Sequence, residues 1–446
     1  MTLVLTGGRV VTSLDPVELV DADVTIDGGR IVAVGWGDPD PEGSPAAVQI
    51  DVAGCLVIPG NVCAHHHLYS ALARGMPYSL EPPRNFVEIL RRIWWRLDRA
   101  LDEETIRASA LVGGAAALLA GTTTVIDHHA SPGAIDGSLD IVADALGSLG
   151  VRSVLCYEVT DRDGPPRAAE GVRENERFLR TRRPLARGHV GAHASFTMSD
   201  ETLSACVELA DRTGTGLHIH VAEDAADQTD AFARFGRSVV RRLADAGALT
   251  ERALLAHCIH LDGADAELIR DAGPSVAHNP TSNMNNSVGH AVVDRLGPHV
   301  ALGTDGIGGD LFAESKAAYF RARDDDVDRS IGWPLGLLAE GARLAGRVFG
   351  EPDLGRIVPG APADLVVLDY LPPTPLSADN LAGHWLFGFD ASAVRDVVVA
   401  GEPVVRDRRL TRVDRDELTA DAVRQGARLW ERLEAVPEHD FQPVGG

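Results

Sequence analysis

The segment of sequence that best indicates the fold is LVIPGNVCAHHH, residues 56–67. The stretch is an apolar run of strand length that ends in three histidines, and Pro59-Gly60 supplies a turn or bulge inside it. Seven more apolar runs of strand length follow, with helical patterns between them. The eight expected strands span residues 56–64, 122–127, 153–158, 189–194, 217–222, 254–258, 275–277 and 300–304.

Strands that alternate with helices are typical of repeated βα units and a parallel sheet. One expected helix begins near Asp102, a residue type that caps helices, and ends before Gly121. Another runs from Ser199 to about Gly214. Eight such units favour a closed barrel, because open doubly wound sheets usually have fewer. We therefore predict an α/β protein with a (β/α)8 TIM-type barrel over residues 56–355.

The two ends of the chain show a different pattern. Residues 1–55 contain short strands with Gly-Gly pairs, where tight hairpins need a positive φ. The same pattern returns over residues 363–370 and 394–410. We expect the two ends to pair into one small composite β-sandwich, formed by residues 1–55 and 356–446, with a C-terminal helix in the second segment. The barrel is then a domain inserted between them.

The composition excludes several classes of partner. The chain of 446 residues carries 42 Lys and Arg against 65 Asp and Glu, a formal net charge of −23. Nucleic acids and anionic membranes are bound mainly through clustered basic residues, so we expect neither as a partner. Lys316 is the only lysine, which excludes a P-loop or Schiff-base lysine at every other position.

The cysteines and the N-terminus indicate the compartment. Five cysteines are scattered without paired spacing, a pattern typical of free thiols in a reducing environment. The N-terminal MTLVLTGGRVV has neither a basic region nor an apolar run long enough for a signal peptide. We expect a cytoplasmic protein.

Polar residues stand where the expected strands end. In a barrel the active site is built at the carboxyl ends of the strands. The residues there are His65-His66-His67, Asp127-His128-His129, Glu158, His193, His218, His220 with Glu223, His257, His278-Asn279 and Asp305. Imidazoles and carboxylates are the usual ligands of Zn²⁺ and related ions, so this pattern predicts a metal site.

The spacing narrows the choice of ligands. Residues two apart project to the same side of an extended chain, which selects His65 and His67 as a pair. His220 is the third candidate ligand and Asp305 the fourth. Glycines on both sides of Thr304-Asp305 would let another backbone or a ligand approach closely. Three imidazoles and one carboxylate leave room for a water molecule, whose pKa a metal lowers to about 7 in favourable cases.

At this point the chain resembles a known family. The motifs are Pro59-Gly followed by His65-x-His67, Gly121-Thr-Thr-Thr, His220-x-x-Glu223, Ala256-His257-Cys, Asn279-Pro-Thr-Ser-Asn-Met, Gly303-Thr-Asp-Gly and Gly360-Ala-Pro-Ala-Asp-Leu-Val. In this order and spacing they are similar to the amidohydrolase superfamily, in its mononuclear deaminase and chlorohydrolase branch, and most similar to the SsnA-type aminohydrolases. The resemblance covers nearly the whole chain.

The resemblance implies a cofactor and a division of roles. His65, His67, His220 and Asp305 would hold one divalent ion, usually zinc and sometimes iron, and no organic cofactor is expected. One metal is expected because the fourth strand carries His193 and no lysine that could bridge two ions. Glu223 and His257 would be the acid/base pair, with Asp305 accepting a proton from the water.

The same resemblance implies the reaction. Hydroxide would attack a ring carbon of an aminated heterocycle of purine, pterin or pyrimidine type, and Glu223 would pass protons to a ring nitrogen and to the departing amine. Ammonia needs a proton to leave, so the presence of Glu223 favours deamination over dehalogenation. The candidate substrate contacts are His193, His129, Arg84 and Asn283.

Other interpretations of the same residues stay open. Asp305 alone could form a turn, and His257 could be structural. Trp94-Trp95, in a segment that could close over the site, is more often ordinary packing. The same ligands could support hydrolytic ring opening of a cyclic amide or amidine, and a non-catalytic scaffold is a further alternative. We expect a small-molecule heterocyclic substrate and a homo-oligomer.

Overall fold

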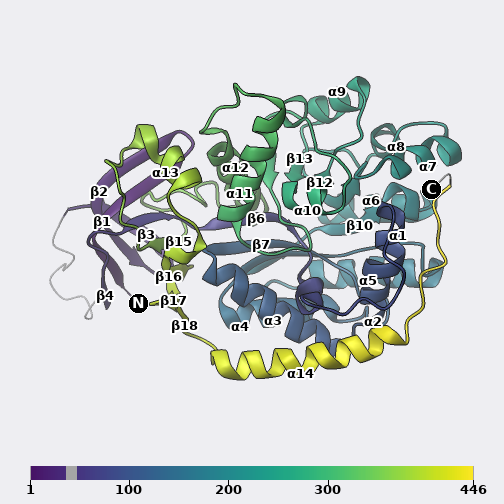
Figure 1. Ribbon diagram of the computed structural model, residues 1–446, viewed down its shortest axis with the longest axis horizontal. Helices are drawn as coiled ribbons and strands as arrows, with labels where there is room; N and C mark the ends of the chain where they lie inside the picture. The colour runs from purple at the N-terminus through teal and green to yellow at the C-terminus, as the bar shows by residue number, and fades with distance from the viewer. Residues whose placement is uncertain (1, 37–47, 445–446) are drawn as a thin grey trace.

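The computed structural model describes residues 2–36 and 48–444. Both ends of the chain meet in a β-sheet at one end of the molecule, and parallel strands with surrounding helices occupy the rest (Figure 1). Within the described ranges, no helix is both long and apolar enough to cross a bilayer. All five cysteines are free and buried, as the sequence predicts.

The terminal segments form one nine-stranded sheet in the order β18-β17-β16-β15-β5-β1-β2-β3, with β4 paired to β1. Its strands are β1 (Leu3–Leu14), β2 (Val17–Asp27), β3 (Arg30–Gly35), β4 (Val48–Asp51), β5 (Leu56–Pro59), β15 (Leu365–Leu368), β16 (Val394–Val399), β17 (Glu402–Arg406) and β18 (Arg409–Leu410). The predicted pairing of the two ends is confirmed where β5 runs antiparallel to β15. The hydrogen bonds make a single sheet, however, and not the two sheets of a sandwich.

The expected strand 56–64 is two strands, β5 and β6 (Asn61–His66), which belong to different sheets. Gly60 lies at the break and donates its N–H to the carbonyl of Asp364 at 2.9 Å. A Cβ atom at Gly60 would lie 2.2 Å from Oγ1 of Thr123. Only glycine therefore lets the chain pass from the terminal sheet into the parallel strands at this point.

The parallel strands follow one another in the predicted order. Their backbone hydrogen bonds form two separate sheets and not the one continuous, closed sheet of the predicted barrel. Four form one sheet: β6, β7 (Thr122–His129), β8 (Arg152–Tyr157) and β9 (Ala186–Gly188). Five form a second: β10 (Val190–Ala194), β11 (Leu217–Val221), β12 (Leu254–His257), β13 (Ser275–His278) and β14 (Val300–Leu302). Single bridges join the two sheets at both seams, between His66 and Asp305 and between Val159 and Ala192. The domain limits at residues 55 and 355 stay predictions.

Helices follow most of the parallel strands. They are α1 (Phe86–Ile89), the π-helical turn η2 (Leu90–Trp94), α2 (Trp95–Ala100), α3 (Glu103–Leu119), α4 (Ser138–Leu149), α5 (Pro165–Leu179), α6 (Asp200–Thr213), α7 (Ala225–Phe235), α8 (Val239–Asp245), α9 (Gly263–Ala272), α10 (Pro280–Asn285), α11 (Leu311–Asp325), α12 (Trp333–Phe349), α13 (Leu381–Phe387) and α14 (Arg415–Glu434). The predicted limits of α3 and α6 are confirmed: Asp102 and Ser199 accept hydrogen bonds as N-caps, and Gly214 ends α6 with a φ of 68°.

The chain after α14 returns toward α7 along the side of the molecule (Figure 1). Its segment 435–444 is tied to the parallel-strand region at both ends. Arg91 donates from Nε to the carbonyl of His439 at 2.7 Å, and the N–H of Val444 donates to Asp230 at 2.8 Å. The C-terminal segment thus fastens the η2 turn to the rest of the molecule.

Candidate metal and active site

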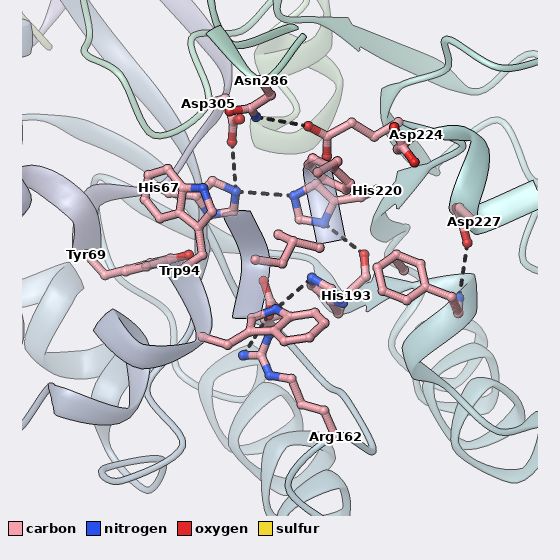
Figure 2. A pocket seen from close by; sticks show the side chains of 17 residues that line it. His67, Tyr69, Trp94, Arg162, His193, His220, Asp224, Asp227, Asn286 and Asp305 are labelled. Atoms are coloured by element: carbon pink, nitrogen blue, oxygen red, sulfur yellow. Dashed lines mark hydrogen bonds and ion pairs between the residues drawn. The ribbon is translucent and has the colours of Figure 1, made fainter. Parts of the chain in front are cut away.

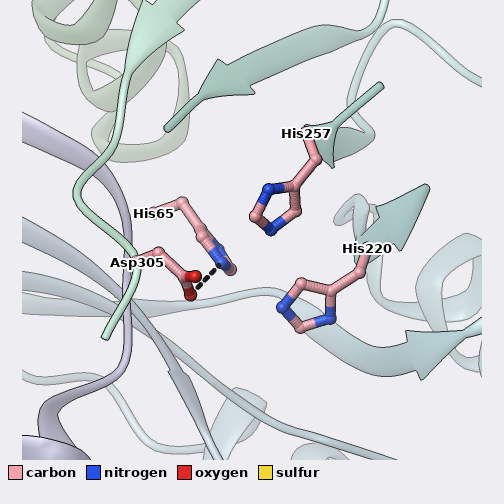
Figure 3. Close-up of side chains that lie close together, drawn as sticks. All are labelled: His65, His220, His257 and Asp305. Atoms are coloured by element: carbon pink, nitrogen blue, oxygen red, sulfur yellow. Dashed lines mark ion pairs between the residues drawn. The ribbon is translucent and has the colours of Figure 1, made fainter. Parts of the chain in front are cut away.

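Side chains from distant parts of the chain meet at the carboxyl ends of the parallel strands. His65 lies in β6, His220 in β11 and His257 in β12, and Asp305 follows β14. Their donor atoms all lie within 4.8 Å of one another (Figure 3). All four side chains are buried.

His67 completes the predicted set from a position just after β6. Its Nε2 atom lies 3.2 Å from Nε2 of His220 and 2.9 Å from Oδ1 of Asp305 (Figure 2). The structure therefore brings together all four side chains that the sequence selects as ligands. It adds His257 as a fifth donor at the same point, so His257 is a ligand candidate that the spacing did not indicate.

The outer nitrogen of each ligand imidazole is held by the protein. Nδ1 of His67 donates to the carbonyl of His128 at 2.6 Å, and Nδ1 of His220 donates to the carbonyl of His193 at 2.8 Å. Nδ1 of His65 pairs with Nε2 of His218 at 2.8 Å. A carbonyl only accepts, so in the neutral rings of His67 and His220 the Nε2 atom carries a lone pair toward the site. Such outer contacts fix the tautomer and direction of metal-binding histidines.

The ring nitrogens and the carboxylate oxygen at the centre of the cluster are arranged to bind a cation and not to hydrogen-bond to one another. The Nε2 lone pairs of His67 and His220 face each other, and Oδ1 of Asp305 is a third acceptor beside them. Among the described residues, Nε2 of His65 finds no hydrogen-bond partner although it is buried. Burial alone would lower the pKa of His67, but the Asp305 carboxylate raises it, so this point favours a positive charge, which is a proton on Nε2 in the metal-free chain and a cation when one is bound. Three nitrogens and one oxygen suit zinc or iron.

Two of the central residues adopt backbone conformations that are rare for side-chain-bearing residues. Asp305 has a φ of 52° and His257 a φ of 73°, both in the left-handed region. Such conformations gather at functional sites, where surrounding contacts hold them. The predicted close approach at the flanking glycines is confirmed. A Cβ atom at Gly303 would lie 2.9 Å from the backbone nitrogen of His65, and one at Gly306 would lie 2.7 Å from Trp94.

Glu223 and His257 lie together beside the ligand cluster. Oε2 of Glu223 is 3.5 Å from Nε2 of His257, and Oε1 accepts a hydrogen bond from Asn286 at 3.3 Å. Burial raises the pKa of Glu223 to about 7. Nδ1 of His257 bonds to Oδ1 of Asn283 at 2.8 Å, which fixes the ring. A carboxyl group that titrates near neutral pH can both give and take a proton.

A pocket opens from the cluster, and aromatic rings form one side of it (Figure 2). Its free volume is about 40 Å³. The aromatic wall comes from three segments, with Tyr69 before α1, Trp94 and Trp95 at the junction of η2 and α2, and Phe196 after β10. Residues of the segment that could close over the site line the pocket, among them Phe86 and Trp94. A flat ring can stack on such aromatic side chains.

The chain matches the family model described as "Amidohydrolase family" over residues 56–404. This span includes the strands β6–β14 and the candidate ligands. The chain belongs to the amidohydrolase family.

Named relatives of this amidohydrolase extend over nearly its whole length. It is 30% identical to a 5'-deoxyadenosine deaminase of Methanopyrus kandleri, over 94% of this chain and 97% of that protein. It is 31% identical to a 5-methylthioadenosine/S-adenosylhomocysteine deaminase of Desulforudis audaxviator, over 92% of this chain and 95% of that protein.

Solved structures share the fold. An adenosine deaminase from Xanthomonas campestris with bound zinc superposes with a TM-score of 0.83 at 24% identity, over 96% of this chain and 98% of that one. The atrazine chlorohydrolase of Arthrobacter aurescens, complexed with zinc, gives 0.81 at 24% identity, over 95% and 100%. At this identity the likeness concerns the fold alone.

The four predicted substrate contacts of the amidohydrolase lie in different surroundings. His193 lines the pocket and is buried. Asn283 is outside the pocket lining and bonds to Nδ1 of His257. His129 bonds to Ser131 at 3.0 Å and is outside the pocket lining. Arg84 has a side chain that is 76% exposed and paired with Glu81, so the structure does not bring it to the pocket.

Sequence reasoning gave no role to a buried ion pair in the pocket wall. Glu158 follows β8, and its Oε1 lies 3.2 Å from Nη2 of Arg162, which also bonds to Asp98. Burial alone would raise the pKa of Glu158, but the Arg162 guanidinium holds it well below its usual range. The position of Glu158 at a strand end was a usable signal. Arg162 lies in the loop between β8 and α5, where no sequence periodicity indicates the direction of its side chain.

Proposed function

We propose that this amidohydrolase removes an amino group, as ammonia, from an aminated nitrogen heterocycle of purine, pterin or pyrimidine type. The observation that carries the proposal is the meeting of three imidazole nitrogens and the Asp305 carboxylate at one point beside Glu223. An aromatic pocket opens from that point. The names of the two relatives, both deaminases of adenine-type nucleosides, support the same reaction type.

His65, His67, His220 and Asp305 would hold one divalent ion, zinc or iron. Such an ion, when bound, lowers the pKa of a coordinated water to about 7 in favourable cases and so supplies hydroxide at neutral pH. Asp305 can take a proton through its inner oxygen, because Ser282 donates a hydrogen bond to the outer one. His257, fixed by Asn283, directs its Nε2 atom toward the reacting oxygen.

Glu223 supplies the protons that the leaving group needs. With a pKa near 7, it is partly protonated at neutral pH and can protonate a ring nitrogen, then regain a proton and pass it to the amine. Oxygen adds to the ring carbon, the exocyclic carbon–nitrogen bond breaks, and ammonia leaves. Asn286 holds the Glu223 carboxyl group in place through both steps.

Further features of the protein remain part of the proposal. They are the placement in the mononuclear branch near the SsnA-type aminohydrolases, the closure of the parallel strands β6–β14 into a barrel, and a homo-oligomeric state. Single bridges at both seams and the shared fold of the zinc-bound neighbours support the barrel. The absence of lysine from the fourth strand, where His193 lies, supports a single ion.

Ammonia release from aminopurines, aminopterins and aminopyrimidines tests the function. We expect turnover of at least one, loss of activity on chelation with recovery on zinc addition, and a decrease of at least about 100-fold in kcat for Asp305→Asn. Asp136→Asn is the matched control, because its side chain is fully exposed. A product heavier by one water that keeps its nitrogen would replace deamination by ring opening. Metal-replete protein that acts on no heterocycle would favour the scaffold.

A further inference from the structure

Two cavities lie on either side of Trp94. The pocket of Figure 2, here called the inner chamber, contains the catalytic residues and has a free volume of about 40 Å³. The neighbouring outer groove, lined by residues that include Arg74, Tyr78 and residues 306–309, has about 480 Å³. Trp94 and Asn286 line both. One water needs roughly 10–15 Å³ by this measure, so the free space of the inner chamber holds about three waters and is too small for a ring together with a sugar.

Trp94 is held firmly as the partition between the two cavities. Its indole lies against Gly306, where a Cβ atom would come within 2.7 Å of it. The π-helical turn that presents it is tied to the C-terminal segment, since Arg92 bonds to Glu438 at 3.2 Å and Arg91 to the carbonyl of His439 at 2.7 Å. Trp94 thus stands between a ring bound in the inner chamber and the outer groove.

The carboxylates that line the inner chamber are all engaged by the protein, which reduces what they offer to a sugar. Vicinal hydroxyl groups of ribose are commonly bound by a carboxylate. All five carboxylates of the lining already have protein partners: Glu158 with Arg162, Glu223 with Asn286, Asp224 with the N–H of Ala226, Asp227 with the N–H groups of Phe196 and Ala222, and Asp305 with His67.

Two polar atoms of the lining suit a ring that has a donor next to an acceptor. The indole N–H of Trp95, a residue only 1% exposed, has no acceptor among the described residues. His193 donates from Nδ1 to Oγ1 of Thr197 at 2.6 Å, because that hydroxyl gives its own proton to the carbonyl of Ala194. Nε2 of the neutral His193 ring is then an acceptor. The pair fits a ring N–H next to a carbonyl oxygen or ring nitrogen.

We propose that the substrate is a free amino-oxo base without a sugar, and that Trp94 excludes the corresponding nucleosides. The inference rests on the proposed deamination and makes it specific. It separates this chain from the relatives whose names specify adenine-type nucleosides. A buried donor left unpaired by a ligand without an acceptor costs affinity, so Trp95 also selects against rings that lack the oxo group.

Matched pairs of substrates test this inference. Ammonia release is measured for guanine and guanosine, cytosine and cytidine, pterin, adenine and 5'-methylthioadenosine. We expect an amino-oxo base to have the highest kcat/KM, at least 100-fold above any nucleoside. Trp94→Ala should decrease the ratio of kcat/KM for the base to kcat/KM for the nucleoside at least tenfold. The decrease should come from a higher kcat/KM for the nucleoside, because the substitution joins the inner chamber to the outer groove. Trp36→Ala, at an indole that is 67% exposed, should leave the ratio unchanged.

A second variant tests the recognition of the ring. Trp95→Phe keeps the aromatic wall and removes the N–H, so KM for the oxo base should rise about tenfold with a smaller change in kcat. Equilibrium binding of the base and its nucleoside to the same proteins provides a readout independent of turnover. If the wild type deaminates a nucleoside as fast as its base, the inference is wrong although the function stands. If it deaminates neither class, the proposed function itself fails.

Discussion

The candidate ligand histidines are oriented through their outer ring nitrogens. In His67 and His220 the Nδ1 atom donates a hydrogen bond to a backbone carbonyl, so Nε2 faces the centre of the candidate metal site. These carbonyls belong to His128 and His193, residues that stand at the ends of other strands. The backbone of neighbouring strands thus orients the ligands. Alternation along β6 was enough to select His65 and His67, because it concerns one strand only.

Asn283 is expected to act on catalysis through His257. Replacing it with leucine removes the 2.8 Å bond that fixes the imidazole, so kcat should fall about 10- to 100-fold. Bound metal should stay at the wild-type level, because Asn283 touches none of the four proposed ligands. Asn283→Asp keeps an oxygen at Nδ1 and should retain more activity than Asn283→Leu, with a shifted pH profile. Equal loss in both variants would refute a role in orienting the ring.

Residues that act through partners were hard to predict. Asn283 and His193 were selected as direct contacts, but the structure gives Asn283 a place behind His257. Arg162 was not found, because its partner Asp98 comes from a distant segment, although Glu158 is only four residues away. Sequence patterns report the direction of a side chain along one element. They do not report which other element faces it.

At the scale of elements, α11 supports the loop after β13 through a buried carboxyl group. Glu314 is 3% exposed and accepts the N–H of Thr281 at 2.9 Å, at the start of α10. Burial raises the pKa of Glu314 from 4.5 to about 7. This α10 carries Ser282 and Asn283, so the contact positions two residues next to the catalytic groups.

The raised pKa of Glu314 predicts how stability depends on pH. The protonated form contributes its full stability below pH 4.5, and this is lost as pH rises from about 4.5 to about 7, because only the unfolded chain ionises there. The loss amounts to about 3 kcal/mol. Glu314→Gln should remove it, so urea unfolding should show the variant gaining on the wild type across this range. Asp324→Asn, on the exposed side of the same helix, is the control. Parallel pH profiles would contradict the account.

Elements with local signals were predicted well, and those decided by tertiary contacts were not. Asp102 and Ser199 cap their helices as expected, since a cap depends on residues three apart. The break at Gly60 was missed as a change of sheet, because it depends on Thr123 and Asp364 across the interface. The π-helical turn η2 has no sequence signature at all.

At the scale of the molecule, the two sheet systems are joined by a buried ion pair. Arg152 of β8 donates from Nε and Nη2 to Asp364 at 2.7 and 3.0 Å, and Asp364 also accepts the N–H of Ala400. Asp364 lies just before β15 and next to the Gly60 crossing. The terminal sheet is therefore bound to the parallel strands near the start of β6, the strand that carries His65. The strand pattern of the sequence could indicate that the two ends of the chain pair. It could not indicate that they contact the parallel strands at the start of β6.

The central claim is that the fold gathers donors from residues 65 to 305 around one divalent ion. Metal analysis of the purified full-length chain, after loading with zinc and removal of excess, tests it most directly. We predict one ion per chain in the wild type and much less than one in His220→Ala, while Asp136→Asn binds like the wild type. X-ray absorption should show a first shell of nitrogen and oxygen. A wild-type chain that retains no ion, or a His220→Ala chain that retains a full equivalent, would contradict the account.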